Sequence, residues 1–383
     1  MGLIFNQITI LDITILLLYT FSFFVYINNS IKNKGFYFIL LLEHLCITLA
    51  YYFYSFNNLA DSTIYYLKTY NITTGWLSSF GFGTDFIHFI LYPFVHYLEL
   101  GYLGCFFIFS SLGLIGFFML AKVALDINKN NWTFLLLLLL SPNLNFWTVA
   151  IGKDSLIFFS ICFIIYNLYY KKNIFWYTIP LIFIALIRFH ILAFIGFSFA
   201  IVTIFFNKKI KLSLKILLSI FFLILCILIF PVFIERIGLD DISNIEQYQE
   251  RITTANMQGG GAIDLYHANV LVKWLAYMFR PLLYDAQNIM GILVSFDNLV
   301  WLIVILYSLL RFFRIRKNIK LDAQTWFYIL SIFSISIPLA IGLSNLGIAV
   351  RQKTMVLPFV FLLIIIFNSF YNYGQKNSHM LFE

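Results

Sequence analysis

Residues 101–121 read GYLGCFFIFSSLGLIGFFMLA and contain no charged side chain. A helix needs about 20 mostly apolar residues to cross the hydrocarbon core of a bilayer, so this stretch is long enough to span a membrane. The rest of the chain has the same character, because 62% of its 383 residues are hydrophobic and 11% are charged. Soluble domains average roughly 45–50% apolar and about 25% charged residues. The composition therefore predicts an integral membrane protein and excludes a soluble enzyme, a secreted disulfide scaffold and a disordered chain.

Further apolar runs of comparable character follow one another along the chain, although several are short. They cover residues 9–28, 36–55, 132–148, 155–170, 174–187, 190–206, 216–234, 298–310, 324–342 and 354–371. We therefore expect an all-α, polytopic helical membrane bundle with about 11 transmembrane helices. Residues 86–98 are also apolar but short, and they contain His88, Pro93 and His96. This composition favours a re-entrant or interfacial helix.

Lys and Arg are distributed unevenly between the segments that join these runs. Most of them fall in residues 29–35, 122–131, 171–173, 207–215, 311–323 and 372–383. Positive charge marks cytoplasmic loops, so the long loops 56–100 and 235–297 are expected outside, together with the N-terminus. The chain shows no linker and no repeat, which favours a single transmembrane domain over 1–383. The polar stretch 240–262 is either a mobile lid or a surface excursion.

The charge and the cysteines exclude several kinds of partner. The net charge of +8 does not indicate a nucleic-acid partner, because membrane proteins concentrate Lys and Arg in cytoplasmic loops. The 4 cysteines lie in apolar runs without a CxxC spacing, and the 6 histidines are scattered. The chain contains no P-loop, GxGxxG, HExxH or GxSxG motif. We therefore expect neither a bound metal nor a cofactor.

The remaining Lys and Arg all map to the outer side or to outer helix ends, against the usual charge rule. They are Lys68, Lys153, Arg188, Arg236, Arg251, Lys273, Arg280, Arg351 and Lys353. For Lys68, Arg236 and Arg251, solvated loop charges are the favoured interpretation. For several of the other positions, the neighbouring residues indicate a more specific role.

Two of these positions lie next to expected helix ends. Lys153 precedes Asp154 at a helix start, where an acid suits the N-cap but a cation is favourable only beside an anion. Arg188 and His190 lie between two apolar runs with almost no loop, which places them at the interface or inside the bundle. Snorkelling to the lipid headgroups is the alternative for this pair.

Two further positions lie near the last spans. Arg280 precedes Asp285 by five residues, and the two side chains could pair with each other. Arg351 and Lys353 precede the last span, where an interfacial anchor is the alternative. Arg suits bidentate phosphate contacts and Lys adds a compact charge, so the pattern predicts an outer pocket for a lipid-linked phosphate or pyrophosphate. Its expected members are Lys153, Arg188, Arg280 and Arg351.

An ionisable pair, Glu43 and His44, falls inside the expected span 36–55. Ionisable groups at membrane depth are costly and are functional hypotheses by default. The pair is either a proton relay or a structural pair whose hydrogen bonds are satisfied within the bundle.

Six short motifs follow one another along the chain and cover most of it. They are D-S-T-I-Y-Y (Asp61 to Tyr66), G-F-G-T-D-F-I (Gly81 to Ile87), N-F-W-x-x-x-I-G-K-D-S-L-I-F-F (Asn145 to Phe159), R-F-H (Arg188 to His190), F-R-P-L-x-Y-D-A-Q-N (Phe279 to Asn288) and S-N-L-G-x-x-V-R-Q-K (Ser344 to Lys353). With these motifs the chain resembles the Wzy-like O-antigen or capsule repeat-unit polymerases of bacterial surface-polysaccharide clusters. No single motif is diagnostic, and related proteins are usually drawn with the N-terminus inside.

The resemblance implies a metal-independent glycosyltransferase of the GT-C type, multi-pass in the bacterial inner membrane. Its donor and acceptor would be oligosaccharides on undecaprenyl pyrophosphate, joined at the extracytoplasmic face, with a chain-length regulator as a further candidate partner. Arginines hold the donor pyrophosphate in such enzymes, which here implies Arg188, Arg280 and Arg351 with support from Lys153. A general base would deprotonate the acceptor hydroxyl. The candidates are His267, His190, Asp61 and Asp285.

Two other functions remain open. A GT-C transferase with a polyprenyl-phosphate monosaccharide donor needs an early acidic residue, for which Asp61 is eligible, and often a divalent metal. A lipid-linked glycan transporter would not be an enzyme, and transporters usually contain internal inverted repeats, of which this sequence shows none.

Overall fold

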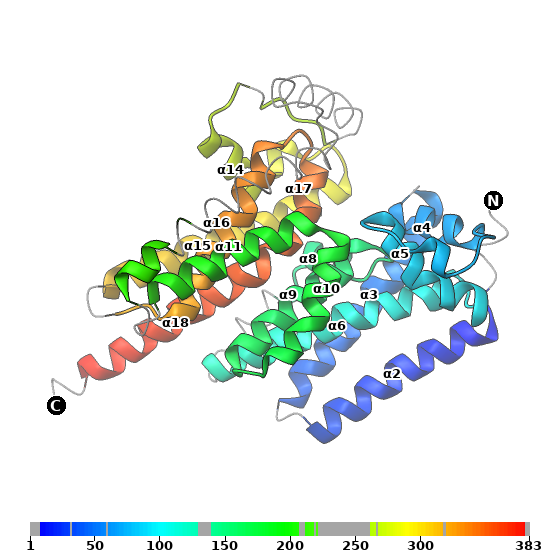
Figure 1. Ribbon diagram of the computed structural model, residues 1–383, viewed down its shortest axis with the longest axis horizontal. Helices are drawn as coiled ribbons and strands as arrows, with labels where there is room; N and C mark the ends of the chain where they lie inside the picture. Colours follow the sequence, from blue (N-terminus) through cyan, green and yellow to red (C-terminus); the bar gives the residue numbers. More distant parts are fainter. Residues whose placement is uncertain are drawn as a thin grey trace. The chain divides into compact units, whose positions relative to one another are not determined.

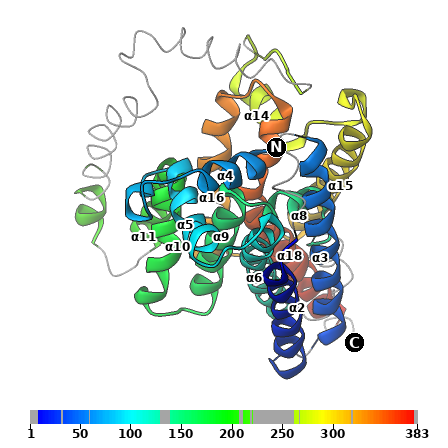
Figure 2. The same cartoon turned by 90° about the vertical axis from the view of Figure 1, so that its right-hand side faces the viewer.

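The computed structural model describes residues 8–30, 33–58, 60–128, 139–206, 211–217, 220, 261–265, 267–316 and 319–379. These residues are mostly helical. In addition, Ala262 and Asn345 form an isolated antiparallel β-bridge. The chain divides into two compact units, unit 1 over Met1–Phe189 and unit 2 over His190–Glu383. Figures 1 and 2 show the helices of each unit from two directions.

The helices of unit 1 come first in the chain. They are α2 (Ile10–Ser30), α3 (Lys34–Asn57), α4 (Asp61–Tyr70), η1 (Leu77–Ser79), α5 (Thr84–Tyr92), η2 (Pro93–Tyr97), α6 (Tyr102–Ile127), α8 (Pro142–Thr148), α9 (Lys153–Tyr169), η3 (Ile174–Tyr177) and α10 (Thr178–Ile187). Those of unit 2 are α11 (Phe189–Phe206), α14 (Val270–Phe279), η5 (Leu283–Asp285), α15 (Ile289–Ile315), α16 (Ala323–Ile341), α17 (Leu346–Gln352), η7 (Lys353–Met355) and α18 (Leu357–His379).

Six of the described helices are long and apolar enough to cross a membrane: α2, α3, α6, α11, α15 and α16. The number rises to as many as eight if the bent pairs α8–α9 and α17–α18 each form one span. The chain is therefore a multi-pass helical membrane protein. The expected count of about 11 stays a prediction. Most of the expected span 216–234, the first part of 132–148 (residues 132–138) and nearly all of the stretch 240–262 lie outside the described residues.

Both long loops contain more helix than the sequence predicts. In the first, α4 precedes the helix expected over 86–98, which begins at Thr84 and continues as a π-helical turn from Pro93. In the second, α15 begins at Ile289, before the expected span start at residue 298. The side chain of Asn288 accepts a hydrogen bond of 2.7 Å from the Gly291 N–H, which caps the new helix start.

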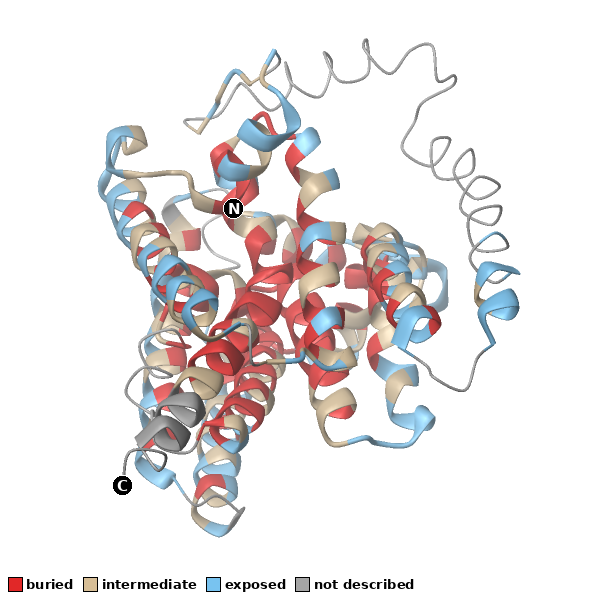
Figure 3. Cartoon of the chain, turned by 90° about the vertical axis from the view of Figure 1, so that its left-hand side faces the viewer, coloured by how far each residue is buried: buried red, intermediate tan, exposed pale blue. Residues whose placement is uncertain are grey.

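The core of unit 1 is built on α6, which packs against α9 and α8. Figure 3 shows the buried positions of the chain in red. Two glycines permit the close approach. A Cβ at Gly113 would collide with the carbonyl oxygen of Thr148, and one at Gly116 would lie 3.0 Å from the Phe158 ring. Small residues allow membrane helices to approach closely in this way, so Gly113 and Gly116 set the spacing of the unit 1 core.

The first helix of unit 1 begins at the same end as the first long loop. Asp12, in the first turn of α2, accepts a hydrogen bond of 3.0 Å from the Gly104 N–H at the start of α6. Nearby, the Tyr102 hydroxyl lies 3.2 Å from the Thr63 hydroxyl of α4. The start of α2 therefore lies beside the segment that joins α3 to α6.

The core of unit 2 is formed by α14, α15, α16 and α18. Phe312 of α15 stacks on Phe367 of α18 with ring centroids 4.2 Å apart, and Arg311 Nη1 donates to the Asn368 side-chain oxygen at 2.9 Å. In the first half of α15, by contrast, the side chain of Asn298 bonds to the backbone that follows α14. The helix α15 therefore runs from the segment around residue 280 toward the segment 311–323.

Candidate functional site

In unit 1, the Arg188 guanidinium lies over the first turn of α9. Its Nη2 donates to Asp154 Oδ1 at 3.0 Å, and the two side chains are 14% and 5% exposed. The Nε atom of Arg188 is buried and has no hydrogen-bond partner among the described residues. Asp154 was expected near an N-cap, and it does lie in the first helical turn, where it also pairs with this arginine. Within the described part of the chain, the arginine therefore has one buried donor without an acceptor.

Segments far apart in the sequence meet at this end of unit 1. The Gly83 N–H donates to the carbonyl oxygen of Leu186 at 2.7 Å, two residues before Arg188. Gly83 has a φ of 67°, and a Cβ placed on it would lie 3.8 Å from Lys153 Nζ. A Cβ on Gly152 would lie 3.0 Å from the Tyr65 ring. Four of the six motifs therefore contribute to one end of unit 1.

The two histidines of the first long loop have a structural role. His88 Nδ1 lies 2.8 Å from the Thr69 hydroxyl, and His96 Nε2 lies 2.8 Å from the Thr69 carbonyl oxygen. Burial lowers the pKa of His88 from its usual value, which suits a neutral ring. Both histidines thus connect α4 to the helix that follows it. Asp61, a candidate base, is exposed at the first position of α4.

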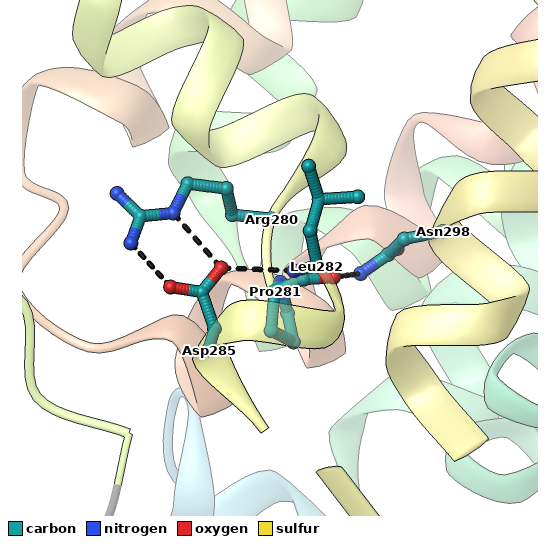
Figure 4. A network of polar contacts seen from close by, with 5 residues as sticks. All are labelled: Arg280, Pro281, Leu282, Asp285 and Asn298. Carbon is teal, nitrogen blue, oxygen red and sulfur yellow. Dashed lines mark hydrogen bonds and ion pairs between the residues drawn. The ribbon is translucent and has the colours of Figure 1, made fainter. Parts of the chain in front are cut away.

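In unit 2, Arg280 directly follows α14 and pairs with Asp285, as Figure 4 shows. Arg280 Nε donates to Asp285 Oδ2 at 3.0 Å, and Nη2 donates to Oδ1. The Leu282 N–H adds a bond of 2.8 Å to Oδ2. The two side chains are 25% and 7% exposed. The sequence alternative in which Arg280 and Asp285 pair is therefore confirmed, and Nη1 of Arg280 is left outside the pair.

The same contacts lower the pKa of the Asp285 carboxyl group. Burial alone would raise the pKa of this carboxyl group, but hydrogen bonds from Arg280 and Leu282 and the arginine charge hold it below its usual value. The hydrogen bond to Asp285 in turn raises the pKa of Arg280. A carboxylate with a low pKa that already accepts three hydrogen bonds is poorly suited to take a proton. The geometry therefore favours a positioning role for Asp285 over the expected role as general base.

Lys353 is buried, with 2% of its surface exposed, and holds the backbone beneath this pair. Its Nζ donates to the carbonyl oxygen of Arg280 at 2.8 Å and to the side-chain oxygen of Asn298 at 2.8 Å. The side-chain nitrogen of Asn298 donates to the carbonyl oxygen of Pro281 at 2.9 Å (Figure 4). Two successive carbonyl groups are thus fixed by two buried side chains. The last two of the six motifs meet here.

Sequence reasoning missed these two buried side chains. It gave an interfacial anchor as the alternative for both Arg351 and Lys353, chose Arg351 for the site, and began a span at Asn298. A usable signal was present, because Asp297 and Asn298 are polar residues beside a long apolar run and both are buried on α15. Polar residues at such depth usually have a named partner.

Three further expected site residues lie on other elements. Arg351 is in the last turn of α17 and is partly buried. His267 is exposed in the turn before α14, and His190 lies against the Phe194 ring in the first turn of α11. The structure thus brings Lys153, Asp154 and Arg188 to one end of unit 1, and Arg280, Asp285 and Lys353 together in unit 2.

In the part of the chain that the structure describes, no three His, Cys, Asp or Glu side chains are arranged to hold a metal ion. Comparisons with protein-family models, with curated proteins and with solved structures found no match for this chain. Two arginine-centred clusters, one in each unit of a multi-pass helical membrane protein, are therefore the candidate functional sites.

Proposed function

We propose that this protein is a membrane glycosyltransferase that polymerises undecaprenyl-pyrophosphate-linked oligosaccharide repeat units into a surface polysaccharide. It would act at the extracytoplasmic face of the bacterial inner membrane, in a bundle of about 11 spans. The supporting observation is Arg188, which pairs with Asp154 through Nη2 while its buried Nε has no acceptor among the residues that the structure describes. Buried donors are almost always satisfied, and a phosphate oxygen is a suitable acceptor for this one.

The Arg280 cluster supports the same proposal. Asp285 holds the guanidinium by two nitrogens, and Lys353 and Asn298 hold the backbone beneath it. An arginine fixed before the reaction can stabilise the negative charge that develops on a departing pyrophosphate without reorganising first. Nη1 of Arg280 is the nitrogen available for that contact.

The proposed reaction is a displacement at the anomeric carbon of the donor. The hydroxyl oxygen of the acceptor sugar forms the new glycosidic bond, and the bond between the anomeric carbon and the pyrophosphate oxygen breaks. Undecaprenyl pyrophosphate leaves with the bonding electron pair, and the hydroxyl proton passes to a general base. His267, His190 and Asp61 are the candidates for this base, because Asp285 is engaged by Arg280.

The decisive experiment replaces Arg188, Arg280 and Arg351 singly with Ala in cells that depend on this protein for their surface polysaccharide. We expect each polysaccharide ladder to collapse to a single-repeat band while the membrane level of the protein is unchanged. Arg314, exposed in the last turn of α15, supplies the matched control R314A, which should leave the ladder intact. Full ladders in all three variants would overturn the proposed pyrophosphate site.

A biochemical assay separates the enzyme from a transporter. Purified protein is mixed in detergent with lipid-linked repeat units as the added substrate, and the products are examined for new glycosidic bonds. A polymerase lengthens the lipid-linked glycan under these conditions, whereas a transporter leaves its length unchanged.

A further inference from the structure

Glu43 lies near the middle of α3, one of the helices long and apolar enough to span the membrane. Both of its carboxylate oxygens are buried and have no hydrogen-bond partner among the described residues. The ion pairs Arg188–Asp154 and Arg280–Asp285 do not include it. Within the described part of unit 1, the Glu43 carboxyl group is thus buried without a compensating group.

The neighbouring His44, unlike Glu43, has a polar partner at each ring nitrogen. His44 Nδ1 lies 3.1 Å from the side-chain oxygen of Asn145, and Nε2 lies 3.0 Å from the carbonyl oxygen of Ser110. The Ser110 hydroxyl lies 2.7 Å from that of Thr48. Both ring nitrogens of His44 are therefore occupied by α8 and α6, and the histidine is a satisfied structural residue. Any chemistry at this position belongs to Glu43 alone.

A second buried oxygen lies at the same level on the adjacent helix. The Tyr19 hydroxyl of α2 is buried, lies close to the Ser110 hydroxyl of α6 and interacts electrostatically with Glu43. Phe24 and Phe38 are in ring contact at 5.4 Å, which sets the register of the antiparallel hairpin formed by α2 and α3. Five residues back from Phe24 is Tyr19, and five residues forward from Phe38 is Glu43. The two residues therefore lie at the same height on neighbouring helices, and the electrostatic interaction between them places their side chains close together.

The groups packed around Glu43 can be named helix by helix. Helix α2 contributes Tyr19. The hydroxyl groups of Thr48 in α3 and Ser110 in α6 are hydrogen-bonded to each other, and Asn145 of α8 bonds to His44. The acid of α2, Asp12, lies at the far end of that helix, where it accepts the Gly104 N–H. The charge of Glu43 therefore meets no cation in these contacts.

An isolated carboxylate is strongly disfavoured in such surroundings, whereas a neutral carboxylic acid is tolerated. We infer that Glu43 is held as a neutral acid and, together with Tyr19, forms a proton-binding site inside unit 1. The ligand of this site is a proton. The inference goes beyond the proposed glycosyltransferase activity, which uses neither residue.

Carbodiimides report directly on this state because they react with the protonated acid. The carboxyl oxygen bonds to the central carbon of the reagent, and the proton moves to one of its nitrogens, giving an O-acylisourea. This adduct rearranges to a stable N-acylurea, with no other reactant required. The full-length protein in lipid vesicles is treated with lipophilic dicyclohexylcarbodiimide or with a water-soluble carbodiimide across a range of pH, and modified peptides are identified by mass spectrometry.

We expect the lipophilic reagent to modify Glu43, the water-soluble reagent to leave it unmodified, and the modification to decline as the pH is raised. E43Q should carry no adduct at this position. Asp12 is the matched control within the same chain, because it is buried but accepts N–H groups from Thr9 and Gly104 and should stay unmodified. Y19F should change the pH at which labelling declines, since it removes only the adjacent hydroxyl.

An absence of adduct on Glu43 at every pH, with other carboxyl groups labelled, would overturn the inference. This measurement uses the wild-type protein, so it holds even if E43Q does not fold. Infrared spectroscopy gives an independent test: the carbonyl stretch of a protonated carboxylic acid should be present in the wild type and lost in E43Q. Identical spectra from two folded proteins would also overturn it, and an unchanged pH profile in Y19F would exclude Tyr19 from the site.

Discussion

The buried ammonium group of Lys353 donates a hydrogen bond of 2.8 Å to the carbonyl oxygen of Arg280, which lies 73 positions earlier in the chain. The same nitrogen donates to Asn298, which in turn holds the carbonyl oxygen of Pro281. The position of the Arg280 guanidinium in unit 2 therefore depends on a residue near the start of the last helix. This dependence leads to the first prediction.

Replacing Lys353 with Met should destabilise unit 2 and shorten the polysaccharide ladder. The variant leaves the Arg280 carbonyl and the Asn298 side-chain oxygen without their donor, and each unsatisfied buried group costs about 1–3 kcal/mol. The midpoint of thermal unfolding in detergent checks the first effect. K320M, at an exposed lysine, is the control and should match the wild type. An unchanged midpoint in K353M would show that these two hydrogen bonds do not stabilise the unit.

The Arg280–Asp285 pair should make stability depend on acid pH. The pKa of Asp285 is lowered in the folded protein, so its contribution is fully present above the unfolded value of about 3.9 and is lost as the pH falls through the folded pKa. The wild type should therefore unfold at a higher temperature than D285N near pH 6, and the difference should shrink below about pH 4.

The control for this pH dependence is a double mutant in which Arg280, the partner of Asp285, is replaced as well. In an R280Q background, the additional D285N substitution should have a smaller effect than it has alone, since the interaction is already lost. A difference between wild type and D285N that stays constant from pH 6 to pH 3 would contradict the assigned role of the ion pair.

Arg188 should not be replaceable by Lys. The arginine pairs with Asp154 through Nη2 and keeps Nε for a ligand, whereas a lysine has a single nitrogen and cannot reproduce the planar fork. We expect R188K to keep most of the thermal stability but to lose about 100-fold in polymerisation rate, the scale seen when one anion-stabilising donor is removed. The initial rate of glycan elongation by purified protein checks the result. Wild-type rates in R188K would rule out a bidentate role for this arginine.

Gly113 should be intolerant of even a methyl group. A Cβ at this position meets the backbone carbonyl of Thr148, which cannot rotate away, so G113A should cost about 1–3 kcal/mol in stability. Gly196 is the matched control, because a Cβ there has nothing within 4 Å and the helix should gain about 0.4–1 kcal/mol from alanine. Thermal unfolding of both variants provides the comparison. Equal midpoints for G113A and G196A would contradict the close packing of α6 against α8.

Part of this molecule is determined by local sequence. The length and apolar character of the runs are sufficient for a multi-pass helical bundle, because a bilayer accepts few other backbone arrangements. The pairing of Arg280 with Asp285 also follows from the chain itself, since five residues separate them across a short turn. For the same reason, Lys153 and Asp154 could be placed at a helix start from sequence alone.

Tertiary structure decided which of the many polar residues became buried and with what partner. Lys353 and Arg351 are two positions apart, yet only the packing of unit 2 directs one of them to Arg280 and Asn298. Glu43 and His44 are adjacent in the chain, but α6 and α8 satisfy the histidine and leave the acid without a partner. Adjacent residues on a helix point in directions about 100° apart, and the environment each one meets depends on helices that are distant in the sequence.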